Sequence, residues 1–373
     1  MMSKSLKIWL AAAGLSAVAL ASAAANPSIA VDVATGKVYG QQDAFQRWYP
    51  ASLTKMMTAY VAFRALQSGQ MTLESPVRMT VNAAKEPPSK MGYKPGSVMT
   101  LDTALKIMLV KSANDVAVAV AEAVGGTESA FVQRMNAEAQ RIGMVGSHFA
   151  NPNGLHDPQN YTTARDLAVL GVQLRREFPQ YAHYFATEAI DPGAGKKVQA
   201  NYNILLGRYD GADGMKTGFV CASGFNLASS ATRNGRTVLA IVLGADRQEA
   251  RAVQAAQLMT DAFRANVSAS AGGVTLATLR PTAGGNLNQA TDMRKAICSQ
   301  QAMADRWDGR DVEGKLKINS PYIHAMDRDP VPVRVGLVSE PGPITRPSQL
   351  DISQIPVPMP RPQRAAGVTT AIN

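Results

Sequence analysis

A serine and a lysine three residues apart could form a nucleophile and its base. Ser52 and Lys55 stand at the head of the segment ASLTKMMTAYVAF, which has almost no polar face. On a helix, positions i and i+3 share one face, so the amine can approach the hydroxyl. A lysine is a base near neutral pH only if desolvation or a nearby cation lowers its pKa, and a buried apolar helix supplies desolvation. The alternative is a surface lysine after a helix cap.

Two further polar motifs strengthen the first interpretation. Ser112 and Asn114 stand in a short bend between two segments of helical apolar spacing, and Lys216, Thr217 and Gly218 open a strand. Each motif alone is weak, because a Ser-x-Asn bend often only caps a helix and a Lys-Thr-Gly often only ends a strand. Their order, separations and expected contexts (helix start, helical bend, edge strand) fit together, and this conjunction is a strong signal.

The elements that must position these motifs follow from hydrophobic periodicity. A hairpin is expected at 28–41, and later strands at 215–222, 224–232 and 236–245, with Asn-Gly at 234–235 suiting a two-residue turn. Helices are expected from 52 to about 66, from Asp102 as cap to about 110, and at 115–124, 127–142, 163–177 and 248–264. Thr163 with Asp166 resembles a capping box. This order of elements indicates an α+β fold with an antiparallel sheet.

The two ends of the chain differ from its middle. Lys4 and Lys7 precede an apolar run at 8–21, and small residues follow, so residues 1–25 are predicted to be a signal peptide that is removed. The alternative is a retained anchor, but the run is shorter than the roughly 20 apolar residues that span a bilayer. Beyond 266 the composition shifts to Gly, Ser and Pro, so residues 267–373 are expected to be mostly irregular, with short ordered pieces near 293–307 and 331–338.

Charge and histidine spacing exclude other classes of function. The formal net charge of +10 is spread thinly along the 373 residues, without the Lys and Arg runs of a nucleic-acid-binding protein. The four histidines, at 148, 156, 183 and 324, lack metal-ligand spacing, so no metal site is expected. His156 with Asp157 is interpreted as part of a turn.

The two cysteines, Cys221 and Cys298, permit a disulfide in an exported chain. We favour the bridge, and two free thiols are the alternative.

The motifs and their surroundings resemble the penicillin-binding proteins of low mass, most closely the serine-type D-alanyl-D-alanine carboxypeptidases of the bacterial envelope. The stretches SIAVDVATGKVYG, KSANDVAVAVAE, NPNGLHDPQNYTTARDLA and GADGMKTGF carry the likeness, over about residues 26–263. The resemblance implies a β-lactamase/transpeptidase-like fold, with an antiparallel five-stranded sheet packed with helices and an all-α lobe. The catalytic domain would be residues 26–266.

The resemblance also implies roles for the first two motifs. Ser52 would attack the carbonyl of the penultimate D-alanine of a peptidoglycan stem peptide and form an acyl-enzyme, releasing the terminal D-alanine. Lys55 would take the hydroxyl proton. Ser112 would relay a proton to the leaving amine, and Asn114 would orient Lys55 and the substrate amide, although the identity of the base is disputed across this superfamily.

Further roles fall on the third motif. Lys216 and Thr217 would hold the terminal carboxylate of the substrate, and the charge of Lys216 would help to keep the lysine base neutral. Gly218 would leave room for the substrate backbone. The backbone N–H groups of Ser52 and Phe219 would form the oxyanion hole. No cofactor is implied, and β-lactams would act as covalent inhibitors.

Some features depart from the family pattern or stay open. Arg247 and Arg251 could add to carboxylate binding, but solvated helix arginines are the favoured interpretation. No amphipathic C-terminal helix of the kind that anchors many relatives is evident. A periplasmic enzyme without that anchor is therefore expected.

Rival functions share parts of this pattern. A β-lactamase would add a deacylating carboxylate in a Glu-x-x-Leu-Asn pattern, which the sequence lacks between its second and third motifs. An endopeptidase acting on crosslinked peptidoglycan would use the same machinery and stays open. A catalytically silent wall-binding module is disfavoured, because every polar residue that the chemistry needs is present. The sequence also has no Gly-x-Ser-x-Gly elbow for a Ser-His-Asp hydrolase.

Overall fold

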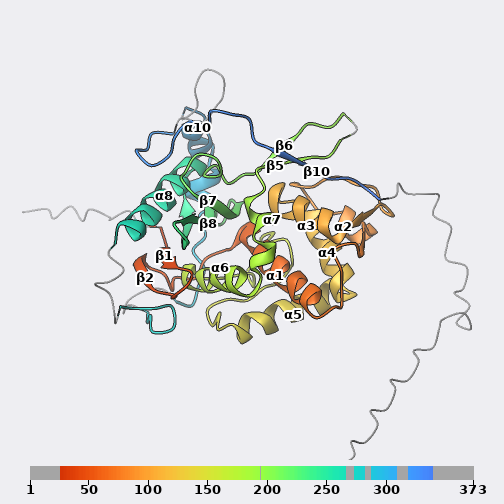
Figure 1. Cartoon of the computed structure of the whole chain (residues 1–373), viewed down its shortest axis with the longest axis horizontal. Coiled ribbons are helices and arrows are strands. Elements are labelled where there is room, and N and C mark those ends of the chain that lie inside the picture. Colours follow the sequence, from red (N-terminus) through yellow and green to blue (C-terminus); the bar gives the residue numbers. More distant parts are fainter. Residues whose placement is uncertain (1–25, 194, 266–272, 282–286, 309–317, 339–373) are drawn as a thin grey trace, which may run out of the picture.

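The computed structural model describes residues 26–193, 195–265, 273–281, 287–308 and 318–338 (Figure 1). The expected signal peptide, residues 1–25, lies outside the described residues. So do residues 339–373, at the C-terminal end, where no anchor helix is expected. Within the described ranges, no helix combines the length and the apolar character needed to cross a membrane.

A five-stranded antiparallel sheet forms the centre of the fold, as predicted. Its order is β2-β1-β9-β8-β7, so β7, which carries the third motif, lies at an edge. The strands are β1 (Ser28–Asp32), β2 (Val38–Gln42), β7 (Ala212–Val220), β8 (Gly224–Arg233) and β9 (Arg236–Ala245). Asn234 and Gly235, between β8 and β9, both have positive φ, as expected of an Asn-Gly hairpin turn.

Helices cover both faces of the sheet, so β8 and β9 are buried along most of their length. On one face lies α8 (Gln248–Arg264) (Figure 1). It packs small side chains such as Ala252 and Ala256 against the sheet. On the other face lies α6 (Ala164–Glu177), where the absence of a side chain at Gly171 leaves space for Leu239. Alternate residues of β9 divide between the two layers: Val238, Ala240 and Val242 belong to the α8 side, and Leu239, Ile241 and Leu243 to the side of the larger core.

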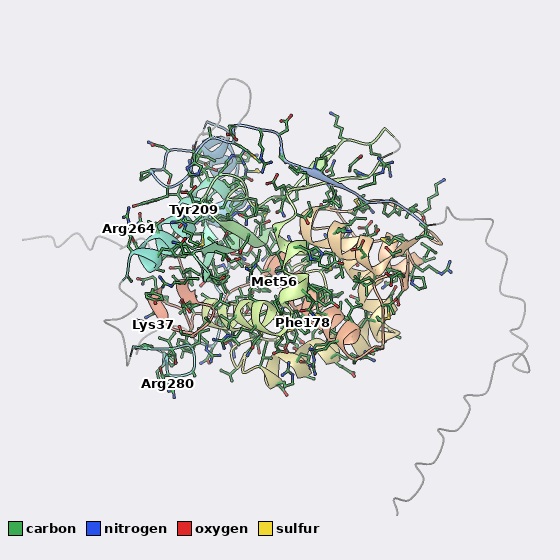
Figure 2. All side chains as sticks on the ribbon, viewed as in Figure 1. Lys37, Met56, Phe178, Tyr209, Arg264 and Arg280 are labelled. Carbon is green, nitrogen blue, oxygen red and sulfur yellow. A yellow bond between two sulfur atoms is a disulfide. The ribbon has the colours of Figure 1, made fainter. Side chains whose placement is uncertain are left out.

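The remaining helices form an all-α lobe around α1 (Thr54–Gln67), whose residues from Thr54 to Phe63 are all buried. Met56 of α1 and Phe178 have no exposed surface and lie in the interior in Figure 2. The other helices of this part of the fold are α2 (Val81–Ala84), α3 (Leu101–Val110), α4 (Asn114–Gly125), α5 (Glu128–Arg141) and α7 (His183–Ala186), with 3-10 turns at Ala51–Leu53 and Pro179–Tyr181. The prediction of a helix buried in the middle of a domain is thus confirmed.

One of the two expected helix caps is wrong. Helix α3 is capped by Thr100, whose hydroxyl accepts from the Thr103 N–H, because Thr100 is extended while Asp102 is already helical. The Asp102 carboxylate instead accepts from Tyr184 (2.7 Å). Helix α6 does begin after Thr163, whose hydroxyl accepts from the Asp166 N–H at 3.0 Å.

The described C-terminal residues fold back onto the rest of the chain. A short strand, β10 (Pro332–Arg334), pairs in parallel with β5 (Ala189–Asp191), which pairs with β6 (Gln199–Ala200). Helices α9 (Arg294–Cys298) and α10 (Gln300–Asp308) lie within the first stretch where ordered pieces were expected. The strands of this sheet, and of the pair β3 (Pro76–Arg78) and β4 (Val98–Thr100), were not predicted, since two or three residues carry too little periodicity.

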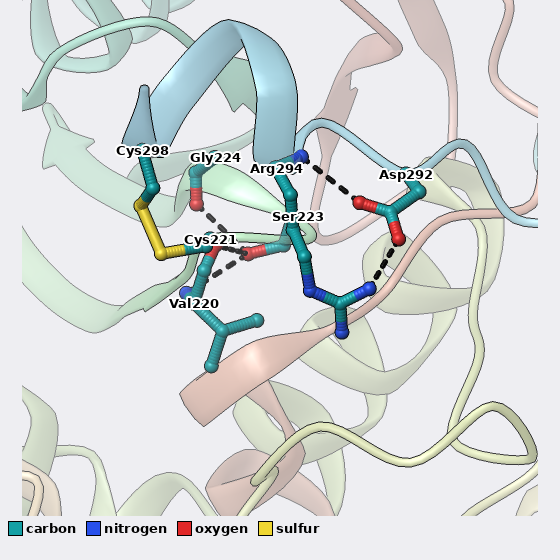
Figure 3. The surroundings of a disulfide bond; sticks show 7 residues. All are labelled: Val220, Cys221, Ser223, Gly224, Asp292, Arg294 and Cys298. Carbon is teal, nitrogen blue, oxygen red and sulfur yellow. Dashed lines mark hydrogen bonds and ion pairs between the residues drawn. A yellow bond between two sulfur atoms is a disulfide. The ribbon is translucent and has the colours of Figure 1, made fainter. Parts of the chain in front are cut away.

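A disulfide joins this C-terminal region to the edge of the main sheet (Figure 3). It links Cys221, directly after β7, with Cys298 at the end of α9, over a Cα–Cα distance of 5.6 Å. Beside it, the backbone N–H of Met293 donates to the carbonyl of Ala222 (3.0 Å). The bridge therefore fixes α9 against the loop that follows the third motif.

Replacing both cysteines by serine should lower the free energy of unfolding by about 4 kcal/mol, because the disulfide closes a long loop in the unfolded chain. The loop spans 77 residues. Urea denaturation of the oxidised protein and of Cys221→Ser/Cys298→Ser measures the difference. Reductant should shift the wild-type midpoint and leave that of the variant unchanged. Equal midpoints for the two oxidised proteins would contradict the expectation.

Candidate active site

Ser52 lies in the 3-10 turn that precedes α1, and a buried asparagine holds this turn in place. The Nδ2 of Asn226, on β8, donates to the carbonyls of Tyr49 (2.9 Å) and Pro50 (3.1 Å). Its Oδ1 accepts from the backbone N–H of Gly244 on β9 (2.9 Å). One side chain thus fixes the serine relative to two strands of the sheet.

Lys55 is fully buried and contacts the serine, so the alternative of a surface lysine is wrong. Its Nζ lies 3.0 Å from the Oγ of Ser52, 2.8 Å from the Oδ1 of Asn114 and 2.5 Å from the carbonyl oxygen of Asn153. The carbonyl of Asn153 was not anticipated from the sequence, because any residue can supply one. The amine therefore has one hydroxyl and two acceptors around it, in a fixed position.

The environment of Lys55 makes it able to act as a base. Burial lowers its pKa to about 7, while the carboxylates of Glu86 and Asp115 act in the opposite direction. An ordinary lysine is almost wholly protonated at neutral pH, whereas a group with a pKa of about 7 is roughly half neutral there. A large share of the protein then holds a neutral amine next to the serine hydroxyl.

The second motif lies at the bend between α3 and α4, as predicted, and Ser112 adopts a positive φ of 60° there. The Asn114 side chain reaches in two directions, since its Nδ2 donates to the carbonyl of Pro87 at 3.0 Å. The backbone N–H of Asn114 donates to the carbonyl of Ser89 (2.7 Å). The loop before the second motif is thereby tied to the same amide that contacts the lysine base.

The third motif faces the second across the site. Lys216 is buried, and its Nζ donates to the Oγ of Ser112 (2.9 Å) and to the carbonyl of Thr217 (3.0 Å). Burial, and then the positive charges of Lys55 and Arg251, lower the pKa of Lys216. A hydrogen bond from Lys216 therefore links the edge strand to the hydroxyl of Ser112.

Gly218 allows the edge strand to pass against the serine turn. A Cβ atom at this position would lie 2.9 Å from the carbonyl oxygen of Pro50 and 3.1 Å from the backbone nitrogen of Ser52. Both distances are shorter than ordinary contacts, so a larger residue would push β7 away from the nucleophile. The glycine thus serves the packing of the protein itself.

All three motifs open into one cleft of about 340 Å³. The motif residues on its wall are Ser52, Ser112, Asn114, Thr217 and Gly218, and the rest are Pro88, Ser89, Gly154, Leu155, Tyr202, Phe219, Val220, Phe225, Gln248 and Arg251. Phe219, the expected second member of the oxyanion hole, has 42% of its surface exposed. The wall of the cleft therefore combines polar groups with the aromatic side chains of Tyr202, Phe219 and Phe225.

A model of the family described as D-alanyl-D-alanine carboxypeptidase matches residues 15–247. The chain belongs to this family. It is 31% identical over 242 residues to D-alanyl-D-alanine carboxypeptidase DacF of Bacillus subtilis, covering 64% of this chain and 62% of that protein. It is 34% identical over 243 residues to DacC of Escherichia coli, covering 63% and 60%. The chain thus spans about six tenths of the length of these curated relatives.

Solved structures of related proteins share the fold. The D-alanyl-D-alanine carboxypeptidase DacD of Francisella tularensis matches with a TM-score of 0.62 and 29% identity, over 70% of this chain and 74% of that one. Penicillin-binding protein D2 of Listeria monocytogenes, in its ampicillin-bound form, matches with a TM-score of 0.57 and 26% identity, over 65% and 98%. The β-lactamase/transpeptidase-like fold is confirmed.

The prediction for Arg251, in this chain of the carboxypeptidase family, is wrong. It was interpreted as a solvated helix arginine, but it has only 4% of its surface exposed and lines the cleft. Its Nη1 donates to the carbonyls of Gly218 (3.2 Å) and Asn226 (3.1 Å), and burial lowers its pKa to about 9 against the opposing effect of Glu249. Arg251 shares the buried face of α8 with Ala255 and Met259, so its charge and not its helical position suggested solvent.

The other arginine and the histidines remain apart from the cleft wall. Arg247 forms surface ion pairs with Asp246 and Glu249. His156 packs the edge of its ring on Tyr49, with ring centroids 4.7 Å apart. In the described part of the chain, no three His, Cys, Asp or Glu side chains are grouped to hold a metal ion.

The sequence did not mark Asn226 as a residue that supports the site. Its replacement tests whether it holds the turn that carries Ser52. Asn226→Ala should lower the free energy of unfolding by about 3 kcal/mol, because it leaves a buried N–H and two carbonyls without this partner. Asn82→Ala, at an exposed asparagine, should change it by less than about 0.5 kcal/mol. Urea denaturation measures both. Similar values for the two variants would show that Asn226 does not hold the turn.

Proposed function

We propose that the protein is a serine DD-peptidase that removes the terminal D-alanine from peptidoglycan stem peptides, and that penicillins acylate it. The observation that supports this most strongly is a buried lysine amine 3.0 Å from the Oγ of Ser52, with its pKa lowered to about 7. Membership of the carboxypeptidase family, and the names of its relatives, supply the substrate class.

Acylation begins when the Oγ of Ser52 attacks the carbonyl carbon of the penultimate D-alanine and Lys55 accepts the hydroxyl proton. The carbonyl oxygen becomes an oxyanion, which the backbone N–H groups of Ser52 and Phe219 stabilise. Collapse of this intermediate breaks the C–N bond. The peptide then remains as an ester on Ser52, and water later hydrolyses that ester.

The leaving amine of D-alanine must gain a proton as the C–N bond breaks. Ser112 is suited to supply it, because its hydroxyl receives a hydrogen bond from Lys216 at 2.9 Å and can be reprotonated through this contact. Asn114 keeps the Lys55 amine in place through its Oδ1 at 2.8 Å. The two motifs thus divide proton transfer and orientation between them.

The terminal carboxylate of the substrate requires cations at the far end of the cleft. Lys216 and Thr217 would bind it, as the family resemblance implies, and buried Arg251 on the same wall adds positive charge. Because these cations lie beside the third motif, the cleft favours peptides that end at the second D-alanine. The same machinery could cleave a crosslinked peptide, so endopeptidase activity is the nearest alternative.

The remaining expectations complete the proposal. Residues 1–25 would direct export and be removed, residues 26–266 would form the catalytic domain, and residues 267–373 would follow it as a mostly irregular region. The enzyme would act in the periplasm. Slow turnover of bound penicillin would separate it from a β-lactamase, and loss of D-alanine release without Ser52 would separate it from a silent wall-binding module.

Ser52→Ala should abolish covalent labelling by a fluorescent penicillin and lower D-alanine release from a stem pentapeptide by at least about a thousandfold, because no ester can form. Gel fluorescence and mass spectrometry of the peptide measure the two effects. Circular dichroism checks that the variant is folded. Labelling of the wild type at another residue, or unchanged release by the variant, would refute the proposal.

The rate of penicillin acylation should rise with pH and level off above about 7, because only neutral Lys55 accepts the proton. Glu86→Gln removes a charge that raises this pKa, so the rising limb should move to lower pH. Glu74→Gln, at an exposed position, should leave it in place. Stopped-flow measurements at several pH values test this. A limb that does not move, or moves upward, in Glu86→Gln contradicts the assignment.

A further inference from the structure

A second cavity, of about 380 Å³, lies between the catalytic fold and the C-terminal strand β10. We call it the basic pocket, because each of its three charged wall residues is a cation: Lys94, Lys196 and Arg334. They come from the loop before β4, the loop before β6 and β10. The other wall residues are Gly92, Tyr93, Ser97, Pro192, Val335, Gly336 and Leu337. Three segments distant in sequence thus bring positive charge to one hollow.

Arg334 forms one ion pair at the edge of the basic pocket, and 69% of its side chain is exposed. Its Nη1 pairs with the Oδ2 of Asp191 at 2.8 Å, and the Oδ1 of Asp191 accepts from the Gly193 N–H at 2.8 Å. Gly193 has a φ of 67°, and a Cβ atom there would lie 2.0 Å from the Arg334 guanidinium. Next to it, the Val335 N–H donates to the carbonyl of Asp191 (3.0 Å). The backbone contacts of Asp191 therefore set where this ion pair forms.

The two lysines keep their charges available. Lys196 lies over the ring of Tyr93, 5.0 Å from its centroid, and Lys94 is exposed. Within the described ranges no carboxylate pairs with either lysine. Asp191 offsets only the charge of Arg334, so the basic pocket carries a net charge of about +2 near neutral pH.

Ser97 adds a neutral donor to this wall. It has only 1% of its surface exposed and lines the cavity. A hydroxyl at this position can donate a hydrogen bond to a ligand that carries an acceptor oxygen. Cations together with a hydroxyl donor suit an oxyanion such as a carboxylate.

The basic pocket adjoins the catalytic cleft through one loop. Ser89 lines the cleft and Gly92 lines the basic pocket. They are three positions apart in the chain, so their Cα atoms lie within about 11 Å of each other. The N–H groups of Met91 and Gly92 donate to the buried carboxylate of Asp115, at 3.1 Å and 2.9 Å. Asp115 directly follows Asn114, which contacts the lysine base. The loop is thus fixed to both sites.

We propose that the basic pocket binds a free carboxylate of the peptidoglycan whose stem peptide is being cleaved, as a second substrate-binding site. The inference rests on the function proposed above. Stem peptides carry free carboxylates besides the one at the cleaved end, and neighbouring peptides of a polymer present more of them. A soluble peptide that fills only the cleft would not reach the basic pocket, whereas polymeric substrate would.

The test compares Lys94→Glu/Lys196→Glu with wild type on a short acylated D-Ala-D-Ala peptide and on insoluble peptidoglycan. The variant should show unchanged kinetics with the short peptide and unchanged penicillin labelling. Its apparent KM for peptidoglycan should rise about tenfold and depend less on salt. The matched control is Arg280→Glu/Lys295→Glu, which makes the same change in charge at exposed positions. Figure 2 shows Arg280 at the edge of the molecule.

Equal losses in the two double variants, or no loss in either, would overturn the proposal. Failure of the proposed function has a different signature, because the wild type would then release no D-alanine from the short peptide, and the second site would fail with it.

A binding measurement identifies the source of the anion. Protein whose cleft is blocked by penicillin should sediment with peptidoglycan, and should do so less after the carboxylates of the polymer are converted to amides. Lys94→Glu/Lys196→Glu should show the same loss with untreated polymer. Retention of wild type by anionic phospholipid vesicles, without retention by peptidoglycan, would assign the basic pocket to phosphate and overturn the proposal.

Discussion

The active site depends on the burial of one amine. Lys55 is surrounded by protein on every side, and the free energy needed to bury a charged ammonium is what brings its pKa to about 7. Nearby carboxylates oppose this effect, so the balance requires an apolar helix with very little access to water. The buried faces of α1, and the packing of α4 and α5 around it, are therefore part of the chemistry.

Keeping the amine buried also requires that three distant segments meet without gaps. Asn226 fixes the serine turn to the sheet, and the lack of a side chain at Gly218 lets the edge strand approach that turn. On the opposite side, Asp115 and Asn114 fix the loop that covers the second motif. Each of these contacts is made by a buried polar group or by a glycine, so small changes there should alter the geometry of the serine and lysine.

Much of this arrangement could be predicted from the sequence. The apolar run after Ser52, the Asn-Gly turn and the three motifs give the sheet, the buried helix and most of the cleft, because each has a local pattern. Contacts without a local pattern were missed. Arg251 shares the buried face of its helix, but its charge favoured the solvated interpretation. Asn226 lies inside an ordinary strand, and the carbonyl of Asn153 has no residue type to mark it. These depend on tertiary packing alone.

The pairing of the first strand has a consequence for how the chain reaches this state. β1, at residues 28–32, pairs with β9, at residues 238–242. The strand that is synthesised first therefore cannot complete its pairing until nearly the whole catalytic fold is available. Such non-local pairing raises the contact order and slows folding. This delay would suit a chain that crosses a membrane in an extended form. Its sheet cannot form before the last strand has crossed, so the chain would stay unfolded during the crossing.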